Sequence, residues 1–335
     1  MGIMKRAISY ALTICMVSLG ITVALPPVMA QENFYEGKTL TVVIRSTPGG
    51  GYDFYGRLIA RHIGKHIPGN PDVIAVNRPG AGGMVATNYM FNNAPQDGTE
   101  ILIAPRDLVF SQRTGEPAVR YDAREFNLLG SAGSDTAVFM SAKDVPVKSL
   151  EDLSNFGQTF MFSASGKSGG TYVSMLIFRA GGYDVDIVTG YEGSDDQALA
   201  VLRGEVDGMS GSYSSVRDLI DNGELDVFAK LGNARELADV DDLRNFLEGD
   251  ALSLAQVQMA SRVASRPFMT GPGVPQDRVE ILQQAFKAAL EDPALLADAE
   301  KADRPIDYVG PEEMMDLYEG TLNAPDSVIE VFLEE

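Results

Sequence analysis

Three glycine-rich segments are places where the backbone itself could bind an anion. They are residues 48–53 (PGGGYD), 78–83 (RPGAGG) and 165–171 (SGKSGGT). Each follows a predicted strand and precedes a predicted helix, so each would expose N–H groups at a helix N-terminus. Those donors and the helix dipole favour negative charge, and glycine lets an anion approach the backbone closely. The sequence therefore predicts binding of a small anion by backbone donors.

The third segment also contains two enzyme motifs, and neither is complete. Residues 166–170 match G-x-S-x-G, the pattern around a nucleophilic serine, which needs a histidine base after the serine. The only histidines, His62 and His66, precede it. The Gly-Lys-Ser tripeptide resembles a phosphate-binding P-loop, but Met161 stands where that loop needs glycine. The two histidines have a metal-binding spacing without an evident third ligand. We therefore expect no enzyme, no cofactor and no metal site.

Strand, turn and helix alternate along the chain, which would place the glycine-rich segments at strand ends. In the first part the hydrophobic pattern predicts strands at 40–45, 73–76 and 101–104, and helices at 53–66 and 84–92. In the second part it predicts strands at 137–141, 159–163, 186–189, 208–210 and 225–230, separated by helices. This alternation predicts α/β units with mainly parallel sheets flanked by helices. Ligands bind beyond the carboxyl ends of such strands, where the glycine-rich turns would meet.

The length predicts two domains in residues 31–335. We expect a first lobe of residues 31–132 plus 258–335 and a second lobe of residues 133–257. A strand at 267–270 would return the chain to the first lobe. Two α/β units joined by such a double crossover make a hinged fold.

Residues 1–30 are predicted to be a secretory signal peptide, with cleavage after Ala30. Lys5 and Arg6 precede an apolar run at 8–25, and the chain's only cysteine lies within it. The alternative is an uncleaved membrane anchor, although the run falls short of the roughly 20 residues that a span needs. With 47 acidic and 27 basic residues, the chain has a net charge of −20. Such a charge repels polyanions, so nucleic-acid binding is not expected.

Two segments resemble the ligand loops of a known receptor family. Residues 47–53 (TPGGGYD) and 77–83 (NRPGAGG) are similar to the first and second loops of the Bug family, the solute receptors of tripartite tricarboxylate transporters. Residues 94–99 (APQDGT) resemble the turn that follows. Weaker matches continue to residues 271–275 (GPGVP), so the resemblance covers essentially all of residues 31–335.

The resemblance implies a two-lobed periplasmic-binding-protein (Venus-flytrap) fold that closes on a small carboxylate: a di- or tricarboxylate, an amino acid or an aromatic acid. It also implies membrane transporter subunits driven by an ion gradient as partners, and we expect a monomer. The first two loops of such receptors clasp a carboxylate through backbone N–H groups, and the second lobe adds contacts. The ligand-binding residues expected on this basis are Gly50, Gly51, Tyr52, Asp53, Gly80, Ala81, Gly82, Gly83, Ser165, Ser168, Thr171 and Tyr191.

Three positions depart from the family pattern and bear on the identity of the ligand. Arg45 stands where a proline is common, Arg106 where small hydroxyl residues are more frequent, and Glu192 where lysine is common. Arg45 and Arg106 are expected to pair with a second acidic group of the ligand; the alternative is two solvated loop arginines. Glu192 would instead favour a ligand with a cationic amine. The alternative function is that of a periplasmic ligand sensor in a signalling system.

Overall fold

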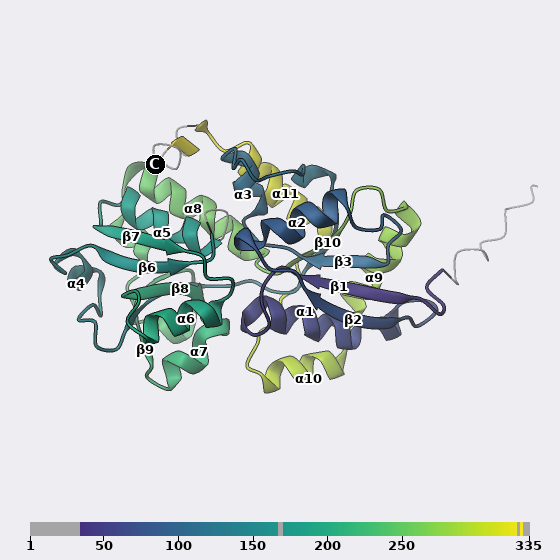
Figure 1. Cartoon of the computed structure of the whole chain (residues 1–335), viewed down its shortest axis with the longest axis horizontal. Coiled ribbons are helices and arrows are strands. Elements are labelled where there is room, and N and C mark those ends of the chain that lie inside the picture. The colour runs from purple at the N-terminus through teal and green to yellow at the C-terminus, as the bar shows by residue number, and fades with distance from the viewer. Residues whose placement is uncertain (1–33, 167–169, 327–328, 331–335) are drawn as a thin grey trace, which may run out of the picture. The chain divides into compact units, whose positions relative to one another are not determined.

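The computed structural model describes residues 34–166, 170–326 and 329–330, which contain two five-stranded sheets flanked by helices (Figure 1). Residues Glu32–Glu335 form one compact unit. The segment predicted to be a signal peptide lies outside the described residues. Within the described part of the chain, no helix is both long and apolar enough to cross a membrane.

The first sheet has the strand order β2-β1-β3-β10-β4. Strand β1 pairs in parallel with β2 and β3, whereas β10 runs antiparallel to both β3 and β4. Its strands are β1 (Thr39–Ile44), β2 (Asp72–Asn77), β3 (Glu100–Ile103), β4 (Asn127–Ser131) and β10 (Pro267–Thr270). The adjoining helices are α1 (Gly50–His62), α2 (Met84–Asn92), α3 (Leu108–Arg113), α9 (Gln276–Leu290), α10 (Pro293–Lys301) and α11 (Pro311–Leu322).

The second sheet has the analogous order β7-β6-β8-β5-β9, with β5 antiparallel to its neighbours β8 and β9. Strand β6 pairs in parallel with β7 and β8. Its strands are β5 (Ala137–Ala142), β6 (Phe160–Ala164), β7 (Val185–Thr189), β8 (Gly208–Ser212) and β9 (Leu225–Leu231). The helices are α4 (Leu150–Ser154), α5 (Gly170–Ala180), α6 (Ser194–Leu202), α7 (Tyr213–Asp221) and α8 (Gly249–Val263). The predicted α/β class is confirmed, and each sheet is mixed.

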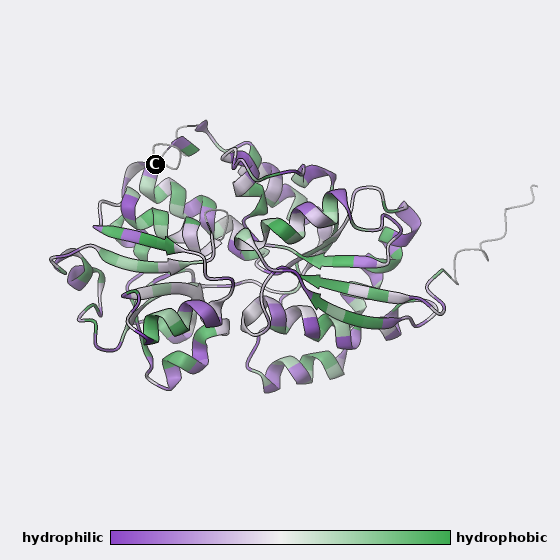
Figure 2. Cartoon of the chain, viewed as in Figure 1, coloured by the Kyte–Doolittle hydropathy of each residue, from purple (hydrophilic) through white to green (hydrophobic). Residues whose placement is uncertain are grey.

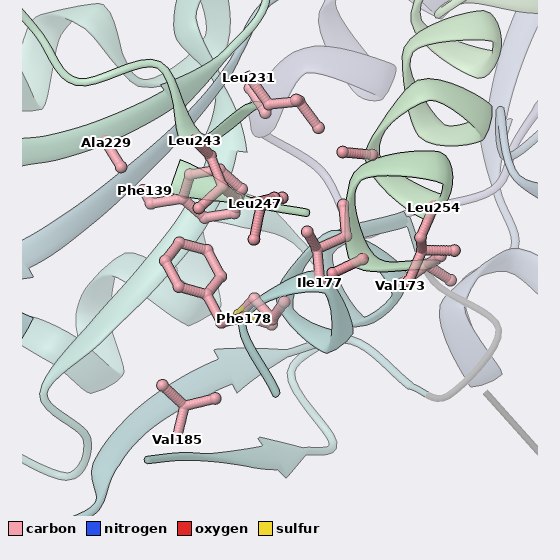
Figure 3. Close-up of a cluster of buried hydrophobic side chains, with 14 of the residues drawn as sticks. Phe139, Val173, Ile177, Phe178, Val185, Ala229, Leu231, Leu243, Leu247 and Leu254 are labelled. Atoms are coloured by element: carbon pink, nitrogen blue, oxygen red, sulfur yellow. The ribbon is translucent and has the colours of Figure 1, made fainter. Parts of the chain in front are cut away.

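Hydrophobic side chains are concentrated on the strands and on the helix faces that cover them (Figure 2). In the second sheet, aromatic rings meet edge to face: the centroids of Phe139 and Phe178 lie 4.6 Å apart, at 75°. Figure 3 shows these rings with Val173, Ile177 and Leu254 from the covering helices α5 and α8. Such offset aromatic pairs add about 1 kcal/mol beyond their burial. The glycine-rich loops are therefore attached to rigid supports.

Two short segments connect the sheets and pair with each other. The N–H of Ala132 donates to the carbonyl of Arg266 at 3.1 Å, and that of Asp135 donates to the carbonyl of Arg262, also at 3.1 Å. Near the C-terminus, Ile329 packs into the hydrophobic cluster of the second sheet, although residues 258–335 were predicted to belong to the first lobe. The exact lobe boundaries remain a prediction.

Candidate functional site

The N-termini of four helices border one cavity of about 60 Å³, which we name the cleft cavity. Helix α1 contributes from the first sheet, and α5, α6 and α7 contribute from the second. Its lining residues are Arg45, Ser46, Thr47, Pro48, Gly49, Gly50, Gly51, Tyr52, Arg106, Gly170, Thr171, Gly193, Ser194, Asp195, Gln197, Ser210, Gly211, Ser212, Ser215 and Arg266. Four positive helix ends thus border one small volume, which favours anion binding there.

A second hollow is larger, at about 670 Å³, but has a different character. Residues of α7, α8 and α10 line it, including Arg217, Met259 and Leu296. None of the three glycine-rich segments borders it. We therefore assign the candidate site to the cleft cavity, because the backbone donors gather there.

The structure brings about half of the predicted site residues to this cavity. Those that line it are Arg45, Gly50, Gly51, Tyr52, Arg106 and Thr171. Ser168 lies outside the described residues. The others are not part of the lining: Asp53, Gly80, Ala81, Gly82, Gly83, Ser165 and Tyr191. Their part in ligand binding remains a prediction.

Asp53 holds the first loop in place from behind. The helix begins at Gly50 with Gly49 as N-cap, three residues before the predicted start at residue 53. The Asp53 carboxylate instead accepts hydrogen bonds from the Gly49 N–H at 3.0 Å, from Arg57 Nε at 2.9 Å and from Asn77 Nδ2 at 2.8 Å. The helix starts earlier because glycine tolerates the positive φ of 92° at position 49.

These hydrogen bonds decide the ionisation of Asp53. Burial disfavours the charged carboxylate, but donation from Arg57, Asn77 and Gly49 outweighs burial and holds the pKa of Asp53 below its ordinary value. A depressed pKa means that the carboxylate stabilises the fold above the unfolded-state pKa, near 3.9, and that this stabilisation is lost as the pH falls below it.

We expect Asp53→Asn to lower the free energy of unfolding by about 2 kcal/mol at pH 7, because a charged acceptor of three donors is removed. The deficit should stay constant from pH 6 to about pH 4.5 and shrink as the pH falls to 3, because the unfolded chain binds a proton there while the depressed pKa keeps folded Asp53 charged. Urea unfolding followed by circular dichroism across this pH range measures both effects. A deficit that stays constant with pH would contradict this account.

The second and third glycine-rich segments meet behind Arg45. Arg45 Nη1 donates to the carbonyl oxygen of Gly82, and the Arg45 side chain lies against Gly83. A Cβ on Gly166 would lie 3.3 Å from the backbone of Ala81, so loops from the two sheets are in close contact there. The second loop thus positions Arg45, which in turn borders the cavity.

Buried arginines form the strongest electrostatic feature of the site. Arg106 Nε lies 3.2 Å from Asp107 Oδ2, and Arg106 Nη1 lies 3.4 Å from Asp135 Oδ2. Arg262 and Arg266 lie 3.6 and 3.9 Å from the same Asp135 oxygen. Together with Arg45, four guanidinium groups share the two carboxylates of Asp107 and Asp135, and we name these six residues the arginine cluster. The cluster carries an excess of positive charge next to the cavity.

Crowding of positive charge is visible in the pKa values. Burial lowers the pKa of Arg262 to about 9, and the neighbouring guanidinium of Arg106 contributes in the same direction. Burial also lowers the pKa of Arg45, against the opposing effect of Tyr52 and with added repulsion from Arg106. Arg106 is the exception, because the carboxylates of Asp107 and Asp135 outweigh burial and raise its pKa. An anion in the cavity would relieve this repulsion.

Tyr52 organises the arginines that face the cavity. The guanidinium of Arg45 lies 4.1 Å from the centroid of its ring and that of Arg266 lies 5.1 Å away. The Tyr52 hydroxyl accepts a hydrogen bond from the backbone N–H of Arg106 at 3.2 Å. One aromatic residue of the first loop therefore contacts all three arginines of the lining, through cation–π contacts and a hydrogen bond.

Several buried polar atoms of the lining have no hydrogen-bond partner among the described residues. They are Arg45 Nε, Arg266 Nε, Thr171 Oγ1, Gln197 Oε1 and Ser210 Oγ. Native proteins leave few buried polar groups unpaired, because each costs about 1–3 kcal/mol. Their convergence on one cavity is the pattern of a site that completes its hydrogen bonds with a polar ligand.

Sequence reasoning missed Asp107, Asp135, Arg262 and Arg266. Arg262 lies in the last turn of helix α8, which was not predicted, and Arg266 lies directly before β10. A signal did exist: two arginines, four residues apart, precede the strand predicted to return to the first lobe. Without the fold, nothing distinguished them from solvated arginines.

Two features define the class of two-lobed solute-binding proteins. Two mixed α/β sheets are joined by paired crossings, and helix N-termini from both sheets border one polar cavity. The particular family follows from residues 56–332, which match the tripartite tricarboxylate transporter family receptor (TctC). The chain belongs to this family, which is a receptor family.

Several solved structures have a similar fold. The periplasmic binding protein BugD has a TM-score of 0.74 at 17% identity, over 90% of this chain and 98% of that one. MatC from Rhodopseudomonas palustris, with bound malate, has a TM-score of 0.71 at 18% identity, over 88% and 98%. R. palustris Rpa4515 with adipate has a TM-score of 0.71 at 20% identity, over 88% and 97%.

Among curated proteins, the chain is 27% identical over 192 residues to the UPF0065 protein in the tcbD-tcbE intergenic region of Pseudomonas sp. strain P51. That match spans 56% of each protein.

Proposed function

We propose that this chain is a periplasmic receptor that binds a small carboxylate in the cleft cavity and delivers it to the membrane subunits of an ion-gradient-driven transporter. Family membership supports the receptor role, and the malate and adipate bound to two proteins of the same fold support an acidic ligand. The observation that carries the proposal is the group of unpaired buried donors and acceptors around one cavity bordered by four helix N-termini.

In this proposal the ligand lies between two lobes, residues 31–132 with 258–335 and residues 133–257. Backbone N–H groups at Gly50, Gly51 and Tyr52 hold one carboxylate, and Thr171 adds a hydroxyl from the second lobe. Arg45 and Arg106 bind the remaining anionic group. The second loop, residues 80–83, supports Arg45 through the Gly82 carbonyl.

Ligand binding would favour a closed arrangement of the lobes, because lining residues come from both. The membrane partner then recognises the surface of the liganded receptor. A signal peptide at residues 1–30 would export the protein.

Isothermal titration calorimetry tests the proposal. Purified protein is titrated with malate, adipate, citrate, glutamate and benzoate, and we expect at least one to bind with a Kd below about 100 μM. Methylamine is the matched control of opposite charge and should not bind. Folded protein that binds no acid of this panel would contradict the proposal. Deleting neighbouring permease genes and measuring uptake of the bound acid then tests the transport role.

A further inference from the structure

Asp135 occupies an unusual place in the arginine cluster. It lies in the crossing from β4 to β5, and its side chain is 2% exposed. Its Oδ2 atom is the common neighbour of Arg106, Arg262 and Arg266, at 3.4, 3.6 and 3.9 Å. Its backbone is paired with the opposite crossing through the carbonyl of Arg262. One carboxylate is therefore the shared counter-ion of three guanidinium groups where the two crossings between the sheets meet.

The contacts of Asp135 are long for ion pairs. Charge-assisted N–H···O hydrogen bonds are usually about 2.7–2.9 Å, and all three distances exceed that range. Arg106 Nη1 makes the only one of them that qualifies as a hydrogen bond among the described residues. Arg262 Nη1 and Arg266 Nε have no hydrogen-bond partner among those residues. The guanidinium groups are therefore incompletely satisfied and can accept a second anion.

The arginines around Asp135 differ in their access to the cavity. Arg106 and Arg266 border the cleft cavity, whereas Arg262 borders only the larger hollow. Arg266 Nη2 also donates to Ser215 Oγ on α7 at 3.3 Å, so Arg266 contacts a lining residue of the second lobe. Asp135 thus lies behind the two arginines that face the cavity and takes part of their charge.

We infer that Asp135 is an internal counter-ion that competes with the anionic group of the ligand for Arg106 and Arg266, and thereby sets the affinity of the site. This inference rests on the proposed function. Asp135 is a positioning residue that acts through the arginines. It keeps the cluster folded when no ligand is bound, at the expense of affinity. Arg262 also lies next to the Asp135 carboxylate but does not border the cleft cavity. It therefore neutralises part of the Asp135 charge and limits the competition with the ligand.

The inference predicts opposite effects for two substitutions that touch no ligand. Asp135→Asn should tighten malate binding about tenfold, because a negative charge behind Arg106 and Arg266 is removed. Arg262→Gln should weaken it about tenfold, because Asp135 then pairs more fully with the two remaining arginines. The double variant should bind malate within about threefold of wild type. Calorimetry at fixed ionic strength measures all four proteins, with adipate as a second probe.

Asp226→Asn is the matched control, because it removes the same charge from the exposed Lys148–Asp226 ion pair. It should leave Kd within about twofold of wild type. Weaker or unchanged binding in folded Asp135→Asn, or an equal gain in the control, would overturn the inference. If Asp135→Asn does not fold, the comparison moves to the double variant, which should bind about tenfold more tightly than Arg262→Gln alone. Equal affinities there would also overturn it.

A second readout separates this inference from the proposed function. Sodium sulfate and sodium chloride at equal ionic strength are compared by thermal unfolding. Sulfate should raise the unfolding midpoint of Asp135→Asn by several degrees more than that of wild type, because it replaces the lost counter-ion. A wild type that binds no acid of the panel contradicts the proposed function alone. Equal sulfate effects in both proteins contradict the inference alone.

Discussion

Arg106→Ala is expected to reduce the affinity for the bound acid about 100-fold, or about 2.7 kcal/mol. The Arg106 side chain is 5% exposed, borders the cleft cavity and is held by Asp107 and Asp135 from the side away from solvent. Its guanidinium also lies 3.5 Å from Ser212 Oγ of the second sheet, so it links both parts of the lining. Calorimetry with the best ligand of the panel measures the loss.

Two further variants separate charge from geometry at this position. Arg106→Lys keeps the charge but loses the planar pair of donors, so its loss should be intermediate, about tenfold. Arg120→Ala removes an exposed arginine of the same lobe and should bind like wild type. A folded Arg106→Ala protein with unchanged affinity would show that Arg106 does not contact the ligand. It would leave Arg45 and the backbone donors to bind the anion.

Gly51→Ala is expected to weaken ligand binding about 30-fold while leaving each lobe folded. Gly51 lies in the first turn of α1, and its φ is not positive, so alanine fits its own backbone. The new Cβ, however, would overlap Ser215 Oγ and lie 3.2 Å from Arg266 Nη2. Overpacking of this kind costs about 2 kcal/mol. The cost falls on the contact between α1 and α7, which joins the two sides of the cavity.

The design includes a compensating change and a matched control. Ser215→Gly removes the atoms that collide, so Gly51→Ala/Ser215→Gly should recover most of the lost affinity. Gly320→Ala adds the same methyl group on α11, where no atom lies within 4 Å, and should not affect binding. Small-angle scattering with ligand should show less compaction for Gly51→Ala than for wild type. Equal compaction and equal Kd would sink the prediction.

Local pattern was sufficient for most of the framework. Helix α2 and strand β10 have the predicted bounds, because glycine or proline lies at or near both ends of each of these largely apolar segments. Strand β4 was missed because it is short and contains Gly130, and α8 was missed because alternating small and polar residues blur its apolar face. Neither element carries a turn signal or a cap strong enough to reveal it.

The sequence by itself determined the class of fold and the chemistry of the loops. Glycines between strands and helices expose N–H groups wherever the chain folds locally in that way, and the expectation of anion binding follows from those groups. Tertiary structure decided which loop reaches the cavity. It brought Gly51 against Ser215 and placed the Gly80–Gly83 loop behind Arg45.

Only tertiary structure could create the arginine cluster. Arg106, Asp135 and Arg266 come from three separate segments of the chain, and each would be an ordinary charged residue if solvated. They come together because the two crossings pair with each other, residues 132–135 with residues 262–266. Charges brought together by pairing at long sequence separation leave no local pattern, because Coulomb energy depends on distance in space and on burial, and neither is written in neighbouring residues.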